Sequence, residues 1–442
     1  MENIIRIKNI DVKNIKNVKH GIIKTNTDFN NMNSSDIIGF YGQNGSGKTA
    51  MVEAFALLKS LLDSKELPDK TEYLLKSDQE SIELFFDFLI KNKFGEYMVR
   101  YESKLELDKE RLTAVVEKLS YKENIANKRF KDIIFKDHNK IEIRKKSIRK
   151  ISEEYRLKVM LSNEMAIANH TGFIFRDELE QVFQNELNKE ELEIIKNLVF
   201  DFNKDFHIID NIQNGLILAN ILLPFSIHLN NSRGKIPYEL KESMLLSQKA
   251  FETIDNVVIQ INAVINSLIP GLQVIVKPIH KETMDSGEEG IRFEFLSEKN
   301  GVRLPLRCES AGILKLISIL STLVAVYNNP NACVVIDELD SGVFEYLLGE
   351  ILEVLDLNGK GQLFFTSHNL RILEVLDNKN LWFTTMNEDN RFIQLKGIKK
   401  LSNARDVYLR AVQLGGQDEE LYKETDSYDI KKAFRKAGGL NV

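Results

Sequence analysis

Cysteine and proline are scarce in this chain: its 442 residues include two cysteines, Cys308 and Cys333, and seven prolines. So few cysteines cannot build a disulfide-rich scaffold or a cysteine-based zinc site, and they indicate a reducing, cytoplasmic environment. No segment is rich in proline, glycine or serine, so the sequence offers no flexible linker between separate domains. A chain of this length can bury a large core, and we expect one interrupted body.

Long hydrophobic runs and a dominant charge are also missing. The longest apolar stretches, 215–227 and 313–326, are shorter than the roughly 20 residues that a membrane-spanning helix needs, and no signal-sequence pattern is present. We therefore expect a cytoplasmic protein without a membrane partner. The net charge of −5 creates no field that favours nucleic acid. The seven histidines are scattered without ligand spacing, which argues against a zinc nuclease.

A glycine-rich segment near the start of the chain fits the phosphate-binding pattern G-x-x-x-x-G-K-[ST]. In this pattern the backbone N–H groups of the loop surround phosphate oxygens, Lys48 reaches the β- and γ-phosphates, and the Thr49 hydroxyl binds Mg²⁺. Apolar residues 37–41 predict a buried strand before the loop, and residues 49–58 predict a helix after it, which is the context that the pattern needs. The expected phosphate-binding residues are Gly42, Asn44, Gly45, Ser46, Gly47, Lys48 and Thr49.

Two later strands are predicted to end in polar residues of the same site. Apolar residues 332–336 form the first, and Asp337 and Glu338 follow at its carboxyl end, where α/β sheets place their ligands. Asp337 would hold Mg²⁺, and Glu338 would act as the general base on the attacking water. The second strand, 362–365, leads to His368, which could contact the γ-phosphate. The simpler alternatives are an acidic helix cap after the first strand and a structural histidine after the second.

A Ser-x-Gly segment, Ser310 to Gly312, precedes an apolar helix, so the motifs occur in a fixed order. The order of P-loop, Ser-x-Gly, strand with Asp-Glu, and strand ending in histidine resembles the ABC-type ATPase heads of the SMC, RecF and overcoming-lysogenization-defect (OLD) proteins. The resemblance covers residues 1–100 and 270–400. It implies an α/β P-loop NTPase fold with an antiparallel β flank, ATP and Mg²⁺ as cofactors, and ATP hydrolysis by Glu338, Lys48 and His368.

The resemblance also implies that two copies of the chain sandwich two ATP molecules. Ser310 and the backbone of Gly312 would touch the γ-phosphate bound to Lys48 of the partner subunit, and Asp340 would lie in the loop that bridges both sites. A glutamine-bearing loop is expected after the P-loop helix, with Gln79 as its candidate. The signature departs from its fullest form because it lacks a doubled glycine. A simple helix cap at Ser310 is the alternative.

The remaining sequence divides into segments by its pattern. We expect a first lobe at 1–125 with alternating strands after the P-loop helix, a mainly helical insertion or lid at 126–268, a second lobe at 269–400 and a tail at 401–442. The insertion is too short for the long coiled-coil arm of SMC proteins. Few residues follow the last core strand, so the nuclease domain of OLD proteins is not expected.

A dense basic tract lies at 128–150, within the expected insertion. Arg144, Lys145 and Lys146 are candidates for nucleic-acid contact, because such a cluster can follow phosphates. Interleaved acidic residues and few aromatic residues favour a solvated charged face instead. Nucleic acid stays a candidate partner beside this simpler alternative.

Together these patterns predict a stand-alone ATPase that forms a homodimer, or a higher oligomer built from it, and signals to a separate effector. Heads of this kind without a nuclease of their own resemble the ATPase subunits of bacterial antiphage and abortive-infection systems, where a nuclease or toxin is the effector. The rival hypotheses are a RecF-like factor of DNA repair or recombination, the ATPase subunit of a membrane transporter, and a scaffold that senses ATP without hydrolysing it. No Asn-Lys-x-Asp guanine reader is present, which favours ATP over GTP.

Overall fold

The computed structural model describes residues 3–68, 71–76, 79–108, 111–218, 222–229, 232–240, 242–397, 403–423 and 425–438. The strands are β1 (Ile4–Ile15), β2 (Val18–Lys24), β3 (Asp36–Tyr41), β4 (Ser81–Asn92), β5 (Gly95–Asp108), β6 (Arg111–Glu123), β7 (Lys131–Asp137), β8 (Lys140–Ile143), β9 (Lys146–Ser147), β10 (Phe206–Ile209), β11 (Leu222–Leu229), β12 (Ser232–Glu239), β13 (Met244–Ser247), β14 (Leu272–Thr283), β15 (Glu289–Lys299), β16 (Val302–Pro305), β17 (Cys333–Ile336), β18 (Gln362–Thr366), β19 (Leu381–Thr384) and β20 (Phe392–Ile393). The α-helices are α1 (Lys48–Leu62), α2 (Glu153–Ala168), α3 (Glu180–Glu186), α4 (Lys189–Lys196), α5 (Asn211–Leu218), α6 (Gln248–Leu268), α7 (Ala311–Asn328), α8 (Glu345–Asn358), α9 (Ile372–Val375), α10 (Ala404–Leu414) and α11 (Ser427–Gly438).

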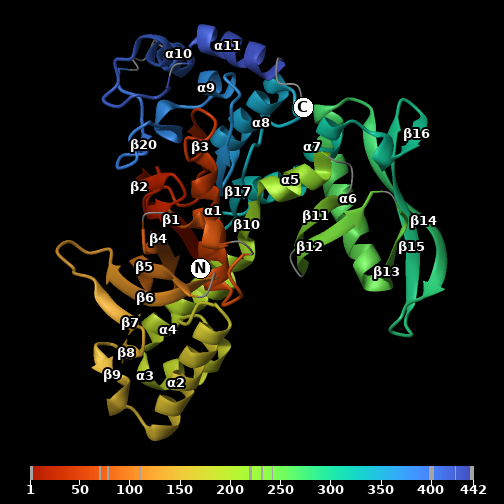
Figure 1. The fold of residues 1–442 in the computed structure, drawn as a ribbon. Coiled ribbons are helices and arrows are strands. Elements are labelled where there is room, and N and C mark those ends of the chain that lie inside the picture. Colours follow the sequence, from red (N-terminus) through yellow and green to blue (C-terminus); the bar gives the residue numbers. More distant parts are fainter. Residues whose placement is uncertain are drawn as a thin grey trace.

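Two large sheets form the body of the protein (Figure 1). The first holds eight antiparallel strands in the order β2-β1-β4-β5-β6-β7-β8-β9. The second holds six strands in the order β10-β17-β18-β3-β19-β20, all parallel except β20. Two smaller sheets, β11-β12 and β13-β15-β14 with β16, lie beside α5, α6 and α7. The predicted α/β fold with an antiparallel flank is confirmed.

The six-stranded sheet separates two hydrophobic cores, because successive side chains of a strand point to opposite faces. Ile38 of β3 joins a core with α1 and the eight-stranded sheet, whereas Ile37 joins a core with α7 and α8. α1 lies between the two large sheets. The ring centroid of its Phe55 is 4.7 Å from that of Phe364 in β18 and 5.9 Å from that of Phe86 in β4. The helix that follows the P-loop is therefore packed on both sides.

Parallel pairing aligns the carboxyl ends of β17, β18 and β3. Val335 of β17 lies opposite Phe364 of β18, which lies opposite Ile38 of β3. This register brings Asp337, Thr366 and the P-loop to one edge of the sheet, where parallel sheets form their ligand sites.

The segment 126–268, predicted to be mainly helical, holds strands as well as helices. β7, β8 and β9 extend the eight-stranded sheet, β10 is an edge strand of the six-stranded sheet, and β11 to β13 belong to the smaller sheets. β8, β9 and β10 have four, two and four residues. Strands this short show no alternation that a sequence window can detect, and the partner of β10, strand β17, lies more than 100 residues later in the chain.

Among the described residues, α7 is the one helix that is long and apolar enough to span a membrane. Its 18 residues extend beyond the stretch 313–326 that the sequence suggested, but 67% of it is buried inside the fold. The core helix of a globular protein has this character, so α7 gives no argument for a membrane partner.

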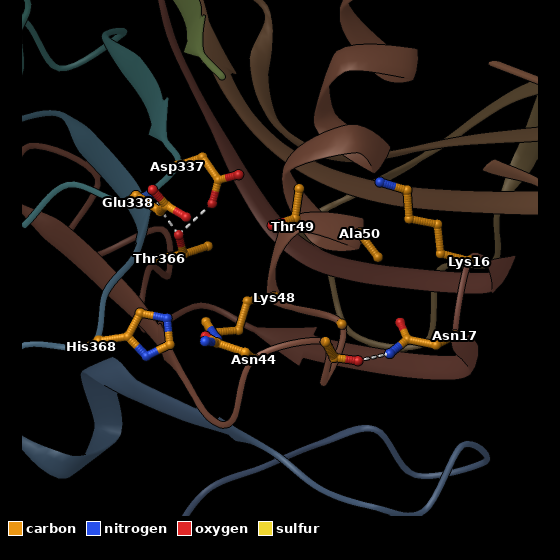
Figure 2. Close-up of a pocket in the computed structure, with 12 residues that line it drawn as sticks. Lys16, Asn17, Asn44, Lys48, Thr49, Ala50, Asp337, Glu338, Thr366 and His368 are labelled. Carbon is orange, nitrogen blue, oxygen red and sulfur yellow. Dashed lines mark hydrogen bonds between the residues drawn. The ribbon is translucent and has the colours of Figure 1, made fainter. Parts of the chain in front are cut away.

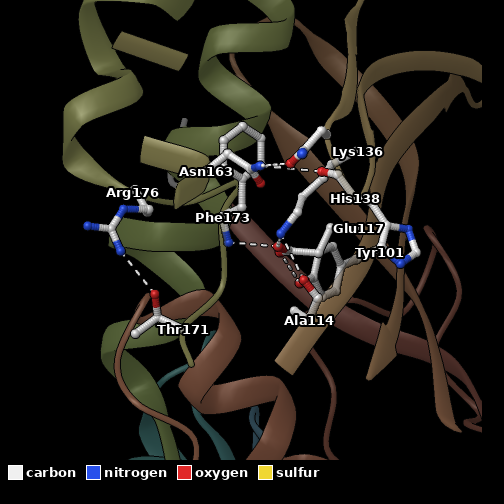
Figure 3. A network of polar contacts seen from close by, with 10 residues as sticks. Tyr101, Ala114, Glu117, Lys136, His138, Asn163, Thr171, Phe173 and Arg176 are labelled. Atoms are coloured by element: carbon white, nitrogen blue, oxygen red, sulfur yellow. Dashed lines mark hydrogen bonds and ion pairs between the residues drawn. The ribbon is translucent and has the colours of Figure 1, made fainter. Parts of the chain in front are cut away.

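A buried polar network fastens the segment after α2 to the eight-stranded sheet (Figure 3). Glu117 of β6 and Lys136 of β7 are fully buried, with 3.9 Å between Oε2 and Nζ. The Glu117 carboxylate accepts hydrogen bonds of 2.7 Å from the Tyr101 hydroxyl and 2.7 Å from the Phe173 N–H. Lys136 Nζ donates to the Ala114 carbonyl at 2.8 Å. Burial raises the pKa of Glu117 and lowers the pKa of Lys136, so each ion depends on the other and on these bonds.

We expect Glu117→Ala to lower the free energy of unfolding by about 3–5 kcal/mol, because it leaves Lys136 buried without its counter-charge. Glu142 of β8 is the matched control, since its 3.3 Å pair with Lys140 is more exposed. Glu142→Ala should cost no more than about 1 kcal/mol. Urea unfolding followed by circular dichroism measures both, and equal destabilisation would contradict the importance of the buried pair.

Candidate functional site

A cavity of about 470 Å³ opens at the carboxyl ends of β3, β17 and β18 (Figure 2). Its walls come from the P-loop, the start of α1, the residues after β17 and β18, and the turn between β1 and β2. The lining residues are Lys16, Asn17, Asn44, Gly45, Gly47, Lys48, Thr49, Ala50, Asp337, Glu338, Thr366 and His368. The structure thus brings the predicted P-loop, acidic pair and histidine together around one space.

The shape of the P-loop depends on the absence of a side chain at Gly42. A Cβ at this position would lie 1.6 Å from Oγ1 of Thr384, which ends β19. The Thr384 hydroxyl donates to the Tyr41 carbonyl at 3.1 Å and lies 2.5 Å from the Ser46 hydroxyl. These contacts hold the loop at the start of α1, so that the free N–H groups of its first turn are available to an anion.

Lys48 is buried at the base of the cavity. Its Nζ donates to the carbonyls of Gly42 at 2.8 Å and Gln43 at 3.1 Å. Burial lowers the pKa of Lys48, and the nearby carboxylates of Asp337 and Glu338 oppose this shift. Phosphate oxygens would be stronger partners for the ammonium than the two carbonyls, because charge-assisted hydrogen bonds exceed neutral ones.

Thr366, the last residue of β18, holds both acidic residues in place. Its hydroxyl donates to Asp337 Oδ1 and accepts a 2.7 Å hydrogen bond from the Glu338 N–H. Asp337 is buried, whereas the Glu338 side chain is exposed at the cavity. Glu338 has a φ of 48°, a left-handed conformation that costs a non-glycine residue about 1–3 kcal/mol. The sequence gives Thr366 no role, because this residue meets Asp337 and Glu338 only through the pairing of β17 with β18.

His368 is exposed at the cavity, and its loop is tied to Asp340. The His368 N–H donates to Asp340 Oδ2 at 3.0 Å. Partial burial and the positive charge of Lys48 lower the pKa of His368, so the neutral imidazole predominates at pH 7. Asp340 is not among the residues that line the cavity.

The turn between β1 and β2 contributes residues that sequence reasoning also misses. The Asn17 side-chain amide donates to the Gly45 carbonyl, and Lys16 pairs with Glu53 of α1. No local signal could have shown this, because the turn meets the P-loop only through the packing of the two sheets.

Thr49 and Asp337 fit the predicted magnesium site. Both line the cavity (Figure 2), and hydroxyl and carboxylate oxygens are ligands that Mg²⁺ accepts together with water and substrate phosphates. The described part of the chain holds no group of three or more His, Cys, Asp or Glu side chains suited to a metal. A metal at Thr49 and Asp337 would therefore be completed by phosphate oxygens and water.

The predicted signature and glutamine residues do not line this cavity within one chain. Ser310 caps α7, where its hydroxyl accepts a 3.3 Å hydrogen bond from the Ile313 N–H. A Cβ at Gly312 would lie 2.1 Å from the Gly342 carbonyl oxygen, so a larger residue cannot fit without movement. Gln79 is likewise not among the residues that line the cavity. The expected roles of Ser310, Gly312 and Gln79 stay predictions.

The basic tract lies at the far end of the eight-stranded sheet, around the turn between β8 and β9 (Figure 1). Arg144 Nε is 3.4 Å from Glu191 Oε2, and Lys145 Nζ is 3.9 Å from Asp132 Oδ2. These acidic neighbours agree with the solvated-face alternative. Nucleic-acid contact by Arg144, Lys145 and Lys146 stays a prediction.

A family model described as “AAA domain, putative AbiEii toxin, Type IV TA system” matches residues 37–374. The match begins in β3 and ends in α9, so it contains most of the cavity. No curated protein matches the chain.

Several solved structures are similar at low identity. The SMC head domain from Thermotoga maritima is 12% identical, with 89% of this chain and 100% of that chain covered and a TM-score of 0.39. An SMC head bound to the C-winged helix domain of ScpA is 12% identical, with 88% and 98% covered and a TM-score of 0.45. The recombination mediator protein RecF with ATP is 11% identical, with 83% and 94% covered and a TM-score of 0.35. Similarity this weak says nothing about activity.

We expect Thr366→Val to slow ATP hydrolysis about 10–100-fold, because Asp337 and Glu338 lose the hydroxyl that orients them. Thr366→Ser keeps the hydroxyl and should stay close to the wild-type rate. Phosphate release measures turnover, and a fluorescent ATP analogue reports binding separately. Wild-type turnover in the valine variant would show that the hydroxyl does not orient the acidic pair.

Proposed function

The chain belongs to the family of AAA domains that the matching model describes, and from this we propose that it is an ATP-binding, ATP-hydrolysing head of the ABC type. Two copies would close around two ATP molecules and signal to a separate effector. The observation that carries the proposal is the single cavity that joins Lys48 and Thr49 to Asp337 and Glu338.

The predicted site residues that line the cavity each have a place in this reaction. The P-loop N–H groups and Lys48 would bind the β- and γ-phosphates, and Thr49 and Asp337 would hold Mg²⁺, which would neutralise phosphate charge when bound. Glu338 would orient a water molecule and accept its proton as that water attacks the γ-phosphate, whose bond to the bridging oxygen breaks to release ADP. His368, as a neutral imidazole, would donate a hydrogen bond to the γ-phosphate.

The position of the signature supports a shared site. Ser310 is exposed at the N-terminal end of α7, outside the cavity of its own chain. The start of a long helix attracts anions, because its first N–H groups lack partners within the helix. A second copy could therefore present Ser310 and Gly312 to the γ-phosphate, and hydrolysis would release the two copies.

The family description supports one biological setting. Its reference to an AbiEii toxin and a Type IV toxin–antitoxin system favours a role in bacterial antiphage defence. A RecF-like role in DNA repair would require the basic tract to bind DNA, but Arg144 and Lys145 have acidic neighbours. The buried position of α7 offers nothing to a membrane partner.

We expect Glu338→Gln to bind ATP, to hydrolyse it about 10²–10⁴-fold more slowly, and to accumulate as a dimer, because the base is lost while the binding residues remain. Lys48→Ala should lose ATP binding and stay monomeric. Light scattering after size exclusion, with and without ATP, measures the assembly. An unchanged rate in Glu338→Gln would remove Glu338 from the role of base.

Mixing two inactive variants tests the shared site directly. Lys48→Ala and Ser310→Arg should each be inactive alone. In a mixed dimer, one site combines the intact P-loop of the Ser310→Arg chain with the intact signature of the Lys48→Ala chain, so the mixture should recover hydrolysis. No recovery, with mixed dimers shown to form, would place both residues in the same chain's site.

A further inference from the structure

Lys315 is a buried cation that the reaction described above does not use. It lies in the second turn of α7, and its side chain is 0% exposed. Its Nζ donates a 2.8 Å hydrogen bond to the backbone carbonyl of Glu338. Burial lowers its pKa to about 8, and the carboxylates of Asp340, Glu338 and Asp337 oppose the shift. Burying a charged amine costs folding free energy, so a functional reason is expected for its contact with the turn that holds Glu338.

The Glu338 peptide is held from both directions. Thr366 accepts from its N–H at 2.7 Å, and Lys315 donates to its carbonyl at 2.8 Å. The φ of 48° at Glu338 is unfavourable for a residue with a side chain, so neighbouring contacts must maintain it. This conformation directs the exposed carboxylate to the cavity.

α7 also contacts the other end of the turn formed by residues 338–342. The backbone of Gly312 approaches the carbonyl of Gly342 so closely that a Cβ would lie 2.1 Å from that oxygen. The helix that begins after Ser310 is thus joined to the 338–342 turn at two points, Lys315 at the start and Gly312 at the end.

We propose that Lys315 is a positioning residue that holds Glu338 in its productive orientation and links this residue to the signature end of α7. The inference rests on the proposed function, since orientation matters only if Glu338 is the base. A shift of α7 when Ser310 enters the site of a second copy would then reach Glu338 of its own chain through Lys315.

Lys315→Met tests the link, because methionine fills similar space without donating a hydrogen bond. We expect kcat to fall about 10–100-fold while KM for ATP changes less than about 3-fold. Lys315→Arg retains a donor and should recover part of the lost kcat. Thr322→Val is the matched control, since Thr322 is equally buried on α7 but has no place in the site; it should keep the wild-type rate. The proposal would be overturned if Lys315→Met changed KM for ATP and left kcat unchanged. It would also be overturned if Lys315→Arg recovered none of the lost kcat.

The decisive experiment combines Lys315→Met with Glu338→Gln. If Lys315 acts through the Glu338 carboxylate, adding Lys315→Met to Glu338→Gln should lower kcat no further, whereas independent roles would multiply the two losses. A wild-type rate of hydrolysis in Glu338→Gln alone would contradict the role of Glu338 as the base. If Glu338→Gln is slow and Lys315→Met lowers its rate by the full factor seen in the wild-type background, only the proposed role of Lys315 is contradicted. Should Lys315→Met fail to fold in thermal melting, the same comparison is made with Lys315→Arg, whose smaller loss must also vanish in the Glu338→Gln background.

Discussion

The site depends on the parallel pairing of β18 with β17 on one side and β3 on the other. This register places the Thr366 hydroxyl between the residues that follow β17 and those that follow β3. Gln362, at the opposite end of β18, uses its side-chain amide to exchange two 2.8 Å hydrogen bonds with the backbone of Ile7 in β1. One short strand therefore fixes the acidic pair at one end and the eight-stranded sheet at the other.

The conformational strain at the site is confined to a few positions that surrounding contacts maintain. Gly42 gives the loop room beside Thr384, and Glu338 keeps a left-handed backbone between Thr366 and Lys315. Backbone strain of this kind persists only where packing determines it, and it commonly marks sites of function. Glu338 lines the cavity itself, whereas Gly42 begins the loop whose later residues Asn44, Gly45 and Gly47 line it.

Several elements were readable from local sequence because their patterns are long or chemically specific. The strand before the P-loop, the helix after it, the long strands β4 to β6, and the strand ahead of Asp337 all have the expected type. The segment 126–268 was harder to read, since β8, β9 and β10 are too short to show alternation. The pairing of β10 with β17 depends on contacts between distant residues, which propensity does not encode.

The sequence by itself determined the chemistry of the site: a loop that fits phosphate, Lys48 and Thr49 after it, and Asp337 with Glu338 after an apolar strand. These signals are local, because each motif needs particular residue types at fixed spacing. Only the tertiary structure decided which other side chains serve them. Thr366 and Lys315 acquire their roles through hydrogen bonds to residues far away in the chain, and such partners are set by strand register and helix packing.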